Sequence, residues 1–68
     1  MKVFVVERGE IGEGGSVFGI YKSLEGAIKL AEVEFDSWDF VGNKRRISET
    51  SWRGDRDYID ITEYEVNE

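Results

Sequence analysis

Apolar positions in the first third of the chain form two runs, separated by a stretch rich in glycine. Residues 2–8 contain the run from Val3 to Val6, which is β-branched or aromatic throughout. Such a run is typical of a strand that is buried on both faces and central in its sheet. Residues 9–15 hold four glycines and predict a loop, and residues 16–21 return to a strand pattern. The two segments therefore predict a β-hairpin with a long, flexible tip.

Residues 24–38 carry apolar side chains at helical spacing. These positions fall at i, i+4, i+7, i+11 and i+14 and form one stripe of an amphipathic helix: Leu24, Ile28, Ala31, Phe35 and Trp38. Ser23 is a suitable N-cap, and Glu25 lies in the first turn, where an acidic side chain meets the positive end of the helix dipole. Trp38 continues the stripe, so we expect its side chain to lie in the core. Gly42 and Asn43 are typical of the turn at the helix exit.

The remainder of the chain predicts two more strands, residues 45–52 and residues 57–66, separated by a turn at 53–56. All elements together predict a single α+β domain over residues 1–68 with the order ββαββ. In this fold one helix packs on one face of a four-stranded antiparallel sheet. If the helix runs back along the sheet, the third strand pairs antiparallel with the first, which gives the strand order 2-1-3-4.

Alternation along the last strand decides which of its side chains face the helix. Strict alternation places Ile59 and Ile61 on one face and the even-numbered residues on the other. A bulge near Thr62 is an alternative, and it would bring Tyr64 and Val66 to the face of the two isoleucines. A strand that is partly covered on both sides is the remaining alternative.

A resemblance to known domains begins at the second strand. The stretch Phe18-Gly-Ile-Tyr-Lys-Ser-Leu-Glu-Gly-Ala27 resembles the G-(I/V)-(Y/F)-x-S-x-E-x-A step of small bacteriophage and bacterial domains of unknown function. Those domains have the order strand, strand, helix, strand, and the segment from Ile59 to Val66 is similar to their acidic last strand. The resemblance covers about half of the chain and departs at residues 44–57, which carry an extra basic strand and turn. It implies this fold and a phage origin, and it supplies no catalytic residue.

Composition excludes several kinds of site. The 68 residues contain no cysteine, histidine or proline, which excludes disulfides, the usual zinc sites, and catalysis by Ser-His-Asp or Cys-His groups. No apolar run approaches the roughly 20 residues of a membrane span. A chain this short also leaves little volume for a ligand pocket of roughly 300 Å³. We therefore expect a cytoplasmic binding protein without membrane contact, cofactor, metal site or enzymatic activity.

Three further patterns have simpler interpretations. The stretch 9–15 leads into a strand and contains Glu10 and Glu13, which repel phosphate, so a hairpin tip fits it better than a phosphate loop. The aspartates within residues 55–60 lack the accompanying glycine and distal glutamate of a calcium loop, and they suit a turn. We expect the basic side chains of segment 44–56 to pair with the acidic last strand. Phosphate binding by this segment stays an alternative.

Fifteen acidic and nine basic residues give a net charge of −6, and several acids recur at regular spacing. On the predicted helix, Glu32, Asp36 and Asp39 fall at i, i+4 and i+7, with about 5–6 Å between neighbours. On the last strand, Glu63 and Glu65 share a face at about 6.8 Å. These intervals are close to the distance between successive phosphates of a nucleic-acid strand. A solvated surface that keeps the domain soluble is the alternative interpretation.

The leading functional hypothesis is a small phage-type inhibitor that mimics nucleic acid. Its acidic face would occupy the basic cleft of a host DNA-binding protein, and the chain would bind no nucleic acid itself. An HU-like nucleoid protein ranks first as the target, followed by a nuclease or RNA polymerase. The bulge alternative would bring Asp60 onto the same face as Glu63 and Glu65. The hypothesis assigns partner binding to six carboxylates and one aromatic anchor: Glu32, Asp36, Asp39, Asp60, Glu63, Glu65 and Trp52.

Two alternatives stay open. Trp52 is assigned as an exposed anchor because tryptophan is enriched at interfaces, and partial burial in the sheet is the other interpretation of this residue. For the whole chain, the alternative function is a structural or assembly module without mimicry. Such a module would use a sheet edge or Trp52 for docking or for homodimerisation.

Overall fold

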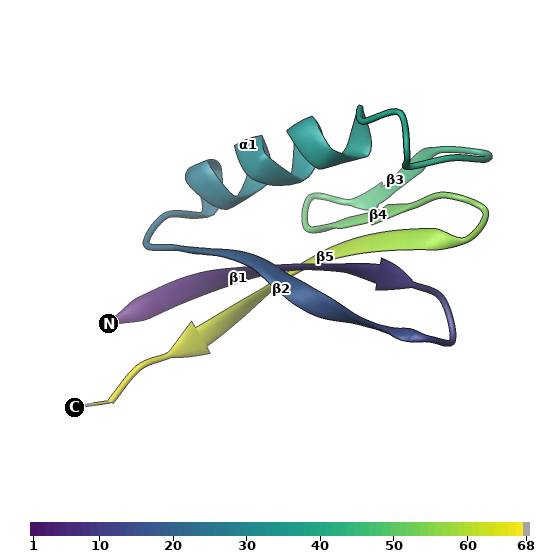
Figure 1. Cartoon of the computed structure of the whole chain (residues 1–68). Helices are drawn as coiled ribbons and strands as arrows, with labels where there is room; N and C mark the ends of the chain where they lie inside the picture. The colour runs from purple at the N-terminus through teal and green to yellow at the C-terminus, as the bar shows by residue number, and fades with distance from the viewer. Residues whose placement is uncertain (68) are drawn as a thin grey trace.

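The computed structural model describes residues 1–67, which form five strands and one helix (Figure 1). The elements follow the order β1 (Lys2–Glu10), β2 (Gly14–Tyr21), α1 (Leu24–Phe35), β3 (Arg45–Ser48), β4 (Ser51–Arg53) and β5 (Asp57–Glu65). The strands form one antiparallel sheet in the order β2-β1-β5-β4-β3, and α1 lies across one face of it. The predicted α+β class, with a helix on one face of an antiparallel sheet, is confirmed.

The described chain has five strands where the sequence predicted four. The predicted strand 45–52 is broken by a turn at Glu49 and Thr50, which separates β3 from β4. Arg46 stabilises this turn, because its guanidinium donates to the carbonyl oxygens of Ser48 at 3.0 Å and of Glu49 at 2.9 Å. These bonds tie the Arg46 side chain to the carbonyl groups at the reversal.

The predicted order 2-1-3-4 is wrong, because the last strand and not the third pairs with β1. The two strands pair antiparallel along their whole length, from Lys2 opposite Glu65 to Glu10 opposite Asp57. Both contain buried residues, whereas every residue of β3 is exposed. Burial of apolar surface therefore favours β1 and β5 in the centre of the sheet and leaves the polar β3 at an edge.

Side chains of β5 alternate strictly, because its register against β1 is unbroken. Ile59 and Ile61 face the helix and are buried, and the even-numbered residues face away. Strict alternation is thereby confirmed, and the alternative of a bulge near Thr62 is wrong. The irregularity lies instead in the pairing of β1 with β2, where the register shifts between Val6 and Glu7.

The predicted hairpin is confirmed, but its tip is short. β1 and β2 extend into the glycine-rich stretch, so only residues 11–13 form the connection. Gly12 and Gly14 adopt positive φ angles of 87° and 79°, a conformation that costs glycine little. The tip is held to the turn before β5, because the Ile11 amide donates to the Arg56 carbonyl oxygen at 2.7 Å.

The helix begins as predicted and ends earlier. Ser23 is the N-cap, and its hydroxyl accepts a hydrogen bond at 3.1 Å from a backbone amide of the first turn. The helix ends at Phe35, after which the Ser37 backbone amide donates to the Glu34 carbonyl oxygen at 3.1 Å and turns the chain. Trp38 therefore leaves the apolar stripe and is 90% exposed. The expectation that Trp38 lies in the core is wrong.

The core lies between α1 and the helix-facing side of the sheet. Its buried hydrophobic members come from most elements of the chain: Val6, Ala27, Ala31, Phe40, Trp52, Ile59 and Ile61. Phe40 takes the place expected for Trp38 and packs edge-on against Phe35, with 5.2 Å between the ring centroids. The small side chains of Ala27 and Ala31 let the helix lie close to the sheet. No helix within residues 1–67 has the length and apolar character that a bilayer span requires.

Candidate functional site

The three carboxylates predicted to form a helical row lie in three different settings. Glu32 is exposed on α1, Asp36 is the C-cap, and Asp39 lies beyond the helix. Because the helix ends at Phe35, the helical spacing does not extend to Asp39. The carboxylate of Asp39 instead contacts the guanidinium of Arg8 on β1 at 3.3 Å.

The three carboxylates of β5 are divided between the two faces of the sheet. Glu63 and Glu65 lie on the helix-facing side, and Asp60 lies on the opposite side. Each is within ion-pair distance of a cation. Asp60 contacts Arg53 at 2.9 Å, Glu63 contacts Lys2 at 3.6 Å, and Glu65 contacts the amino terminus at 3.4 Å. Pairs this exposed contribute little stability, but they cancel negative charge locally.

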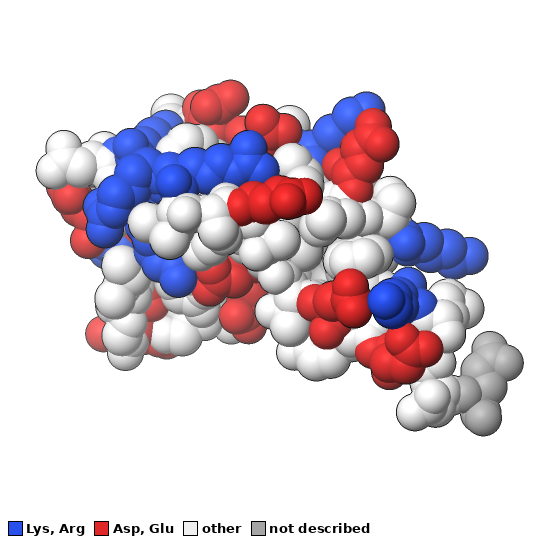
Figure 2. Space-filling view, turned by 180° about the vertical axis from the view of Figure 1, so that it is seen from behind, with Lys and Arg blue, Asp and Glu red and all other residues white. Residues whose placement is uncertain are grey.

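The six carboxylates assigned to partner binding therefore do not form one negative face. Four of them contact a cation, and the set is spread over both faces of the sheet and the helix. Figure 2 shows the same mixing, with acidic side chains beside basic ones and a basic group at the end of the molecule where β3 and β4 lie. The geometric premise of mimicry by these residues, one continuous row of acids, is not met.

Trp52 is a core residue and not an exposed anchor. Its side chain is 1% exposed, and the guanidinium of Arg46 lies 4.8 Å from the centroid of its ring. The two residues face each other across the β3–β4 ladder. The interpretation of Trp52 as an exposed anchor is therefore wrong, and its burial is nearly complete where the alternative expected partial burial in the sheet.

Basic side chains of segment 44–56 are used within the molecule. Arg53 and Arg56 each contact an aspartate of β5, at 2.9 Å and 3.9 Å, so the expected pairing with the last strand is confirmed for these two. Lys44 instead donates to the carbonyl oxygen of Phe35 at 2.8 Å. There its charge meets the negative end of the helix dipole.

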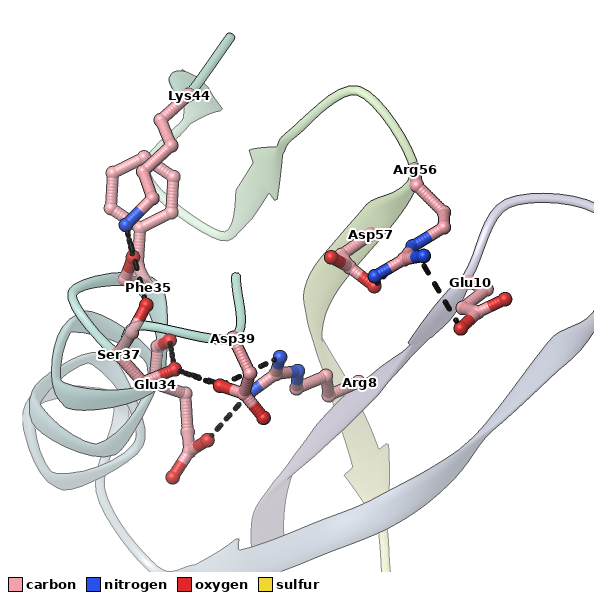
Figure 3. Close-up of polar contacts among 9 residues, drawn as sticks. All are labelled: Arg8, Glu10, Glu34, Phe35, Ser37, Asp39, Lys44, Arg56 and Asp57. Carbon is pink, nitrogen blue, oxygen red and sulfur yellow. Dashed lines mark hydrogen bonds and ion pairs between the residues drawn. The ribbon is translucent and has the colours of Figure 1, made fainter. Parts of the chain in front are cut away.

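A cluster of polar side chains joins the end of α1 to the strand beneath it (Figure 3). The guanidinium of Arg8, whose side chain is 12% exposed, contacts Glu34 at 2.8 Å and Asp39 at 3.3 Å. The Ser37 hydroxyl donates to the Asp39 carboxylate at 2.6 Å. This bond, reinforced by the charge of Arg8, holds the pKa of Asp39 below its ordinary value of 3.8. We call Arg8, Glu34, Ser37 and Asp39 the helix-end clamp.

The helix-end clamp borders a hollow of about 360 Å³. At its other side, Arg56 lies 3.9 Å from both Glu10 and Asp57 (Figure 3). Asp57 is buried, and its Oδ2 atom has no hydrogen-bond partner within residues 1–67. Both arginines that line the hollow are already in contact with carboxylates. We therefore interpret the charged side chains around the hollow as an internal ion network that fixes the end of the helix. The hollow itself is not interpreted as an anion-binding site.

The face of the sheet turned away from α1 is covered by no element of residues 1–67 (Figure 1), and we call it the open face. An exposed antiparallel sheet normally presents polar side chains to water. Across three strands the open face presents apolar or aromatic ones: Val17 and Ile20 from β2, Val3 and Val5 from β1, and Tyr64 from β5. Val17, Ile20 and Tyr64 are 57%, 62% and 54% exposed. An apolar surface of this kind is typical of an interaction site.

Polar groups border the open face at the end near the hairpin tip. The guanidinium of Arg53 pairs with Asp60 and lies 5.6 Å from the centroid of the Tyr58 ring. Burial, followed by the charges of Glu7 and Asp60, raises the pKa of the Tyr58 phenol above its ordinary value of 10.0. Gly15 leaves room for this side chain, because a Cβ atom there would lie 2.6 Å from the Tyr58 hydroxyl. The open face thus combines an apolar area with a polar rim, as protein interfaces do.

The apolar run at the start of the chain is the sequence signal that points to the open face. The run from Val3 to Val6 predicted a strand buried on both faces, but one helix covers only one face of a sheet. Val6 is buried beneath the helix, whereas Val3 and Val5 are only half-buried. Val3 and Val5 therefore indicate that a second surface packs against the open face, and residues 1–67 do not supply one.

No family model, curated protein or solved structure matches the chain. Within the described residues, no group of three or more acidic side chains is placed to hold a metal ion. Among the surfaces of the described residues, the open face is distinguished by its exposed apolar side chains.

Proposed function

We propose that this protein is a small protein–protein interaction module that binds a partner protein through its open face. One observation carries the proposal: the apolar surface of β2, β1 and β5, on which Val17, Ile20 and Tyr64 are more than half exposed. Full burial of an aliphatic side chain contributes about 1.5–3 kcal/mol relative to exposure in water. A partner with a complementary apolar patch therefore gains binding free energy at this surface.

The polar rim supports the same function by fixing how the partner sits. The side chains of Arg53 and Asp60 are 29% and 34% exposed, so both can bond a partner at the edge of the contact without being fully desolvated. Charged groups at a rim contribute more to orientation and association rate than to affinity. The expected partner therefore presents an apolar centre with polar groups beside it.

Site-specific photo-crosslinking tests the proposal. A benzophenone amino acid replaces Tyr64 on the open face in one variant, and Trp38 beyond the end of α1 in a matched variant. Both positions hold exposed aromatic residues, so neither replacement disturbs the core. In cells that express the chain, we expect a covalent adduct with a second protein from position 64 and not from position 38. Equal adducts from both positions, or none from position 64, contradict the proposal.

Nucleic-acid mimicry remains a second hypothesis, favoured by the net charge of −6. Of the assigned carboxylates, Glu32 and Asp36 are exposed and make no ion pair within residues 1–67. The target would be a basic host DNA-binding protein, first an HU-like one. If mimicry operates, the chain displaces DNA from that protein, and the double variant Glu32→Lys, Asp36→Lys does not. Open-face substitutions would leave the displacement unchanged, which separates the two hypotheses.

A further inference from the structure

The two edges of the sheet differ in how they are protected against pairing with another strand. β3 forms one edge and is only four residues long, and two of these are Arg45 and Arg46. β2 forms the other edge with eight residues, GGSVFGIY, none of which is charged or proline. Sheets block their edges with short strands, charges, proline or bulges. β3 is short and charged, whereas β2 has only a bulge.

We propose that β2 pairs antiparallel with the β2 of a second copy of this chain, which joins the two sheets into one. The outer N–H and C=O groups of an edge strand are unpaired and can form a ladder with a further strand. Val17, Phe18 and Ile20 on β2 are all exposed and would gain contacts with the β2 of the second copy. This inference concerns the edge of the sheet and does not depend on the function proposed for the open face.

Charges at the two ends of β2 identify a second copy as the partner. Glu13 precedes the strand and Lys22 follows it, and neither makes an ion pair within residues 1–67. In an antiparallel pair related by a two-fold axis, the start of one strand lies opposite the end of the other. A register that pairs Gly14 with Tyr21 of the second copy places Glu13 opposite Lys22, twice in each dimer. Opposite charges across a strand pair are stabilising.

The bulge in β2 is compatible with the same register. Phe18 is its extra residue, because Val6 of β1 pairs with Gly19 and the next residue, Glu7, pairs with Val17. The bulge shifts the alternation by one residue, so helix-facing positions are even-numbered before it and odd-numbered after it. A two-fold pairing that matches like faces must therefore join an even-numbered residue to an odd-numbered one. The register that does so with the bulges at the axis contains these pairs: Gly14 with Tyr21, Gly15 with Ile20, and Ser16 with Gly19.

Sedimentation equilibrium on the purified chain tests whether the edge associates. We expect a species of twice the 7.8 kDa mass of one chain. Val17→Lys places a charge on the edge strand, and we expect it to raise the dimer dissociation constant at least about tenfold. Tyr64→Lys places the same charge on the open face but two strands away from the edge, and it should change the constant by less than about twofold.

A charge exchange tests the register. Glu13→Lys alone brings two lysines together at each end of the strand pair, and Lys22→Glu alone brings two glutamates together. We expect each single variant to raise the dissociation constant about tenfold at low salt. The double variant Glu13→Lys, Lys22→Glu restores opposite charges and should restore the dimer. A purely structural role of either residue would not produce this recovery.

Circular dichroism of each variant verifies that it is folded. Loss of the dimer in a folded variant is then due to the change at the interface. A monomer at every concentration overturns the inference and leaves the proposed function of the open face untouched. Equal dissociation by Val17→Lys and Tyr64→Lys also overturns it, because the contact then lies on the open face and not at the edge. Failure of the double variant to recover the dimer overturns the assigned register.

Discussion

The environments of the two tryptophans in this chain are set by strand pairing and by the end of the helix. Trp52 has polar neighbours in the chain, yet it is buried, because Arg46 covers its ring and Ile59 pairs with it from the next strand. Trp38 follows an apolar stripe, yet it is exposed, because Ser37 ends the helical stretch before it. Strand pairing and helix termination thus decide the environment of both tryptophans, and local composition does not.

The two tryptophans should differ sharply in their contribution to stability. We expect Trp52→Ala to lower the free energy of unfolding by about 3–5 kcal/mol, because a large buried side chain is lost and leaves a cavity. Trp38→Ala should change it by less than about 0.5 kcal/mol, as is usual for an exposed position. Urea unfolding followed by circular dichroism measures both. Trp52→Phe serves as a milder variant if Trp52→Ala does not fold, and equal effects at the two positions contradict this placement.

At the scale of secondary-structure elements, the sequence predicted several features that depend on local signals, but not the helix end at Phe35 or the turn at Glu49 and Thr50. The N-cap at Ser23 and the hairpin each follow from a few adjacent residues, whereas the strict alternation of β5 was one of three alternatives that the sequence left open. The strand order was not predictable in this way, because it depends on pairing between residues 2–10 and 57–65, at opposite ends of the chain. The same limit applies to the candidate site. An apolar β1 was visible in the sequence, but which of its faces lacks a cover depends on the whole sheet.

The helix-end clamp connects α1 to β1 through charges that titrate in acid. Because the pKa of Asp39 is lowered in the folded chain, its ionised form stabilises the fold above the pKa of the unfolded chain, and this stabilisation is lost as the pH falls through the folded value. We expect the free energy of unfolding to decrease below about pH 4, and to decrease less in the variant Asp39→Asn. Urea unfolding at a series of pH values measures this, with Asp36→Asn as the control. An identical acid dependence for Asp39→Asn and the unmodified chain contradicts the role of the clamp.

At the scale of the whole molecule, the basic side chains and the apolar part of the open face lie in different places. Basic side chains gather at the end where β3 and β4 lie, and acidic ones are mixed with bases elsewhere (Figure 2). The open face is apolar over much of β2, β1 and β5, because Glu7, Asp60 and Arg53 lie together at one end of it. A net charge of −6 adds repulsion between molecules at neutral pH. Removing that charge should therefore expose the attraction between apolar surfaces.

Solubility should reach a minimum near the isoelectric point of about 4.6. Ile20→Lys on the open face and Asn43→Lys in the turn after α1 add the same charge and should move the minimum upward in pH equally. Only Ile20→Lys also removes an exposed apolar side chain, so we expect it alone to reduce light scattering at the minimum. Equal scattering by both variants would show that net charge alone controls association.

The contrast between the two indole rings also has a practical consequence. Trp52, enclosed between Arg46 and the core, emits fluorescence from an apolar surrounding that is lost only when the domain opens. Trp38 emits from water in the folded and the unfolded chain alike. One emission spectrum therefore contains a reporter of folding and an internal reference, without any attached dye.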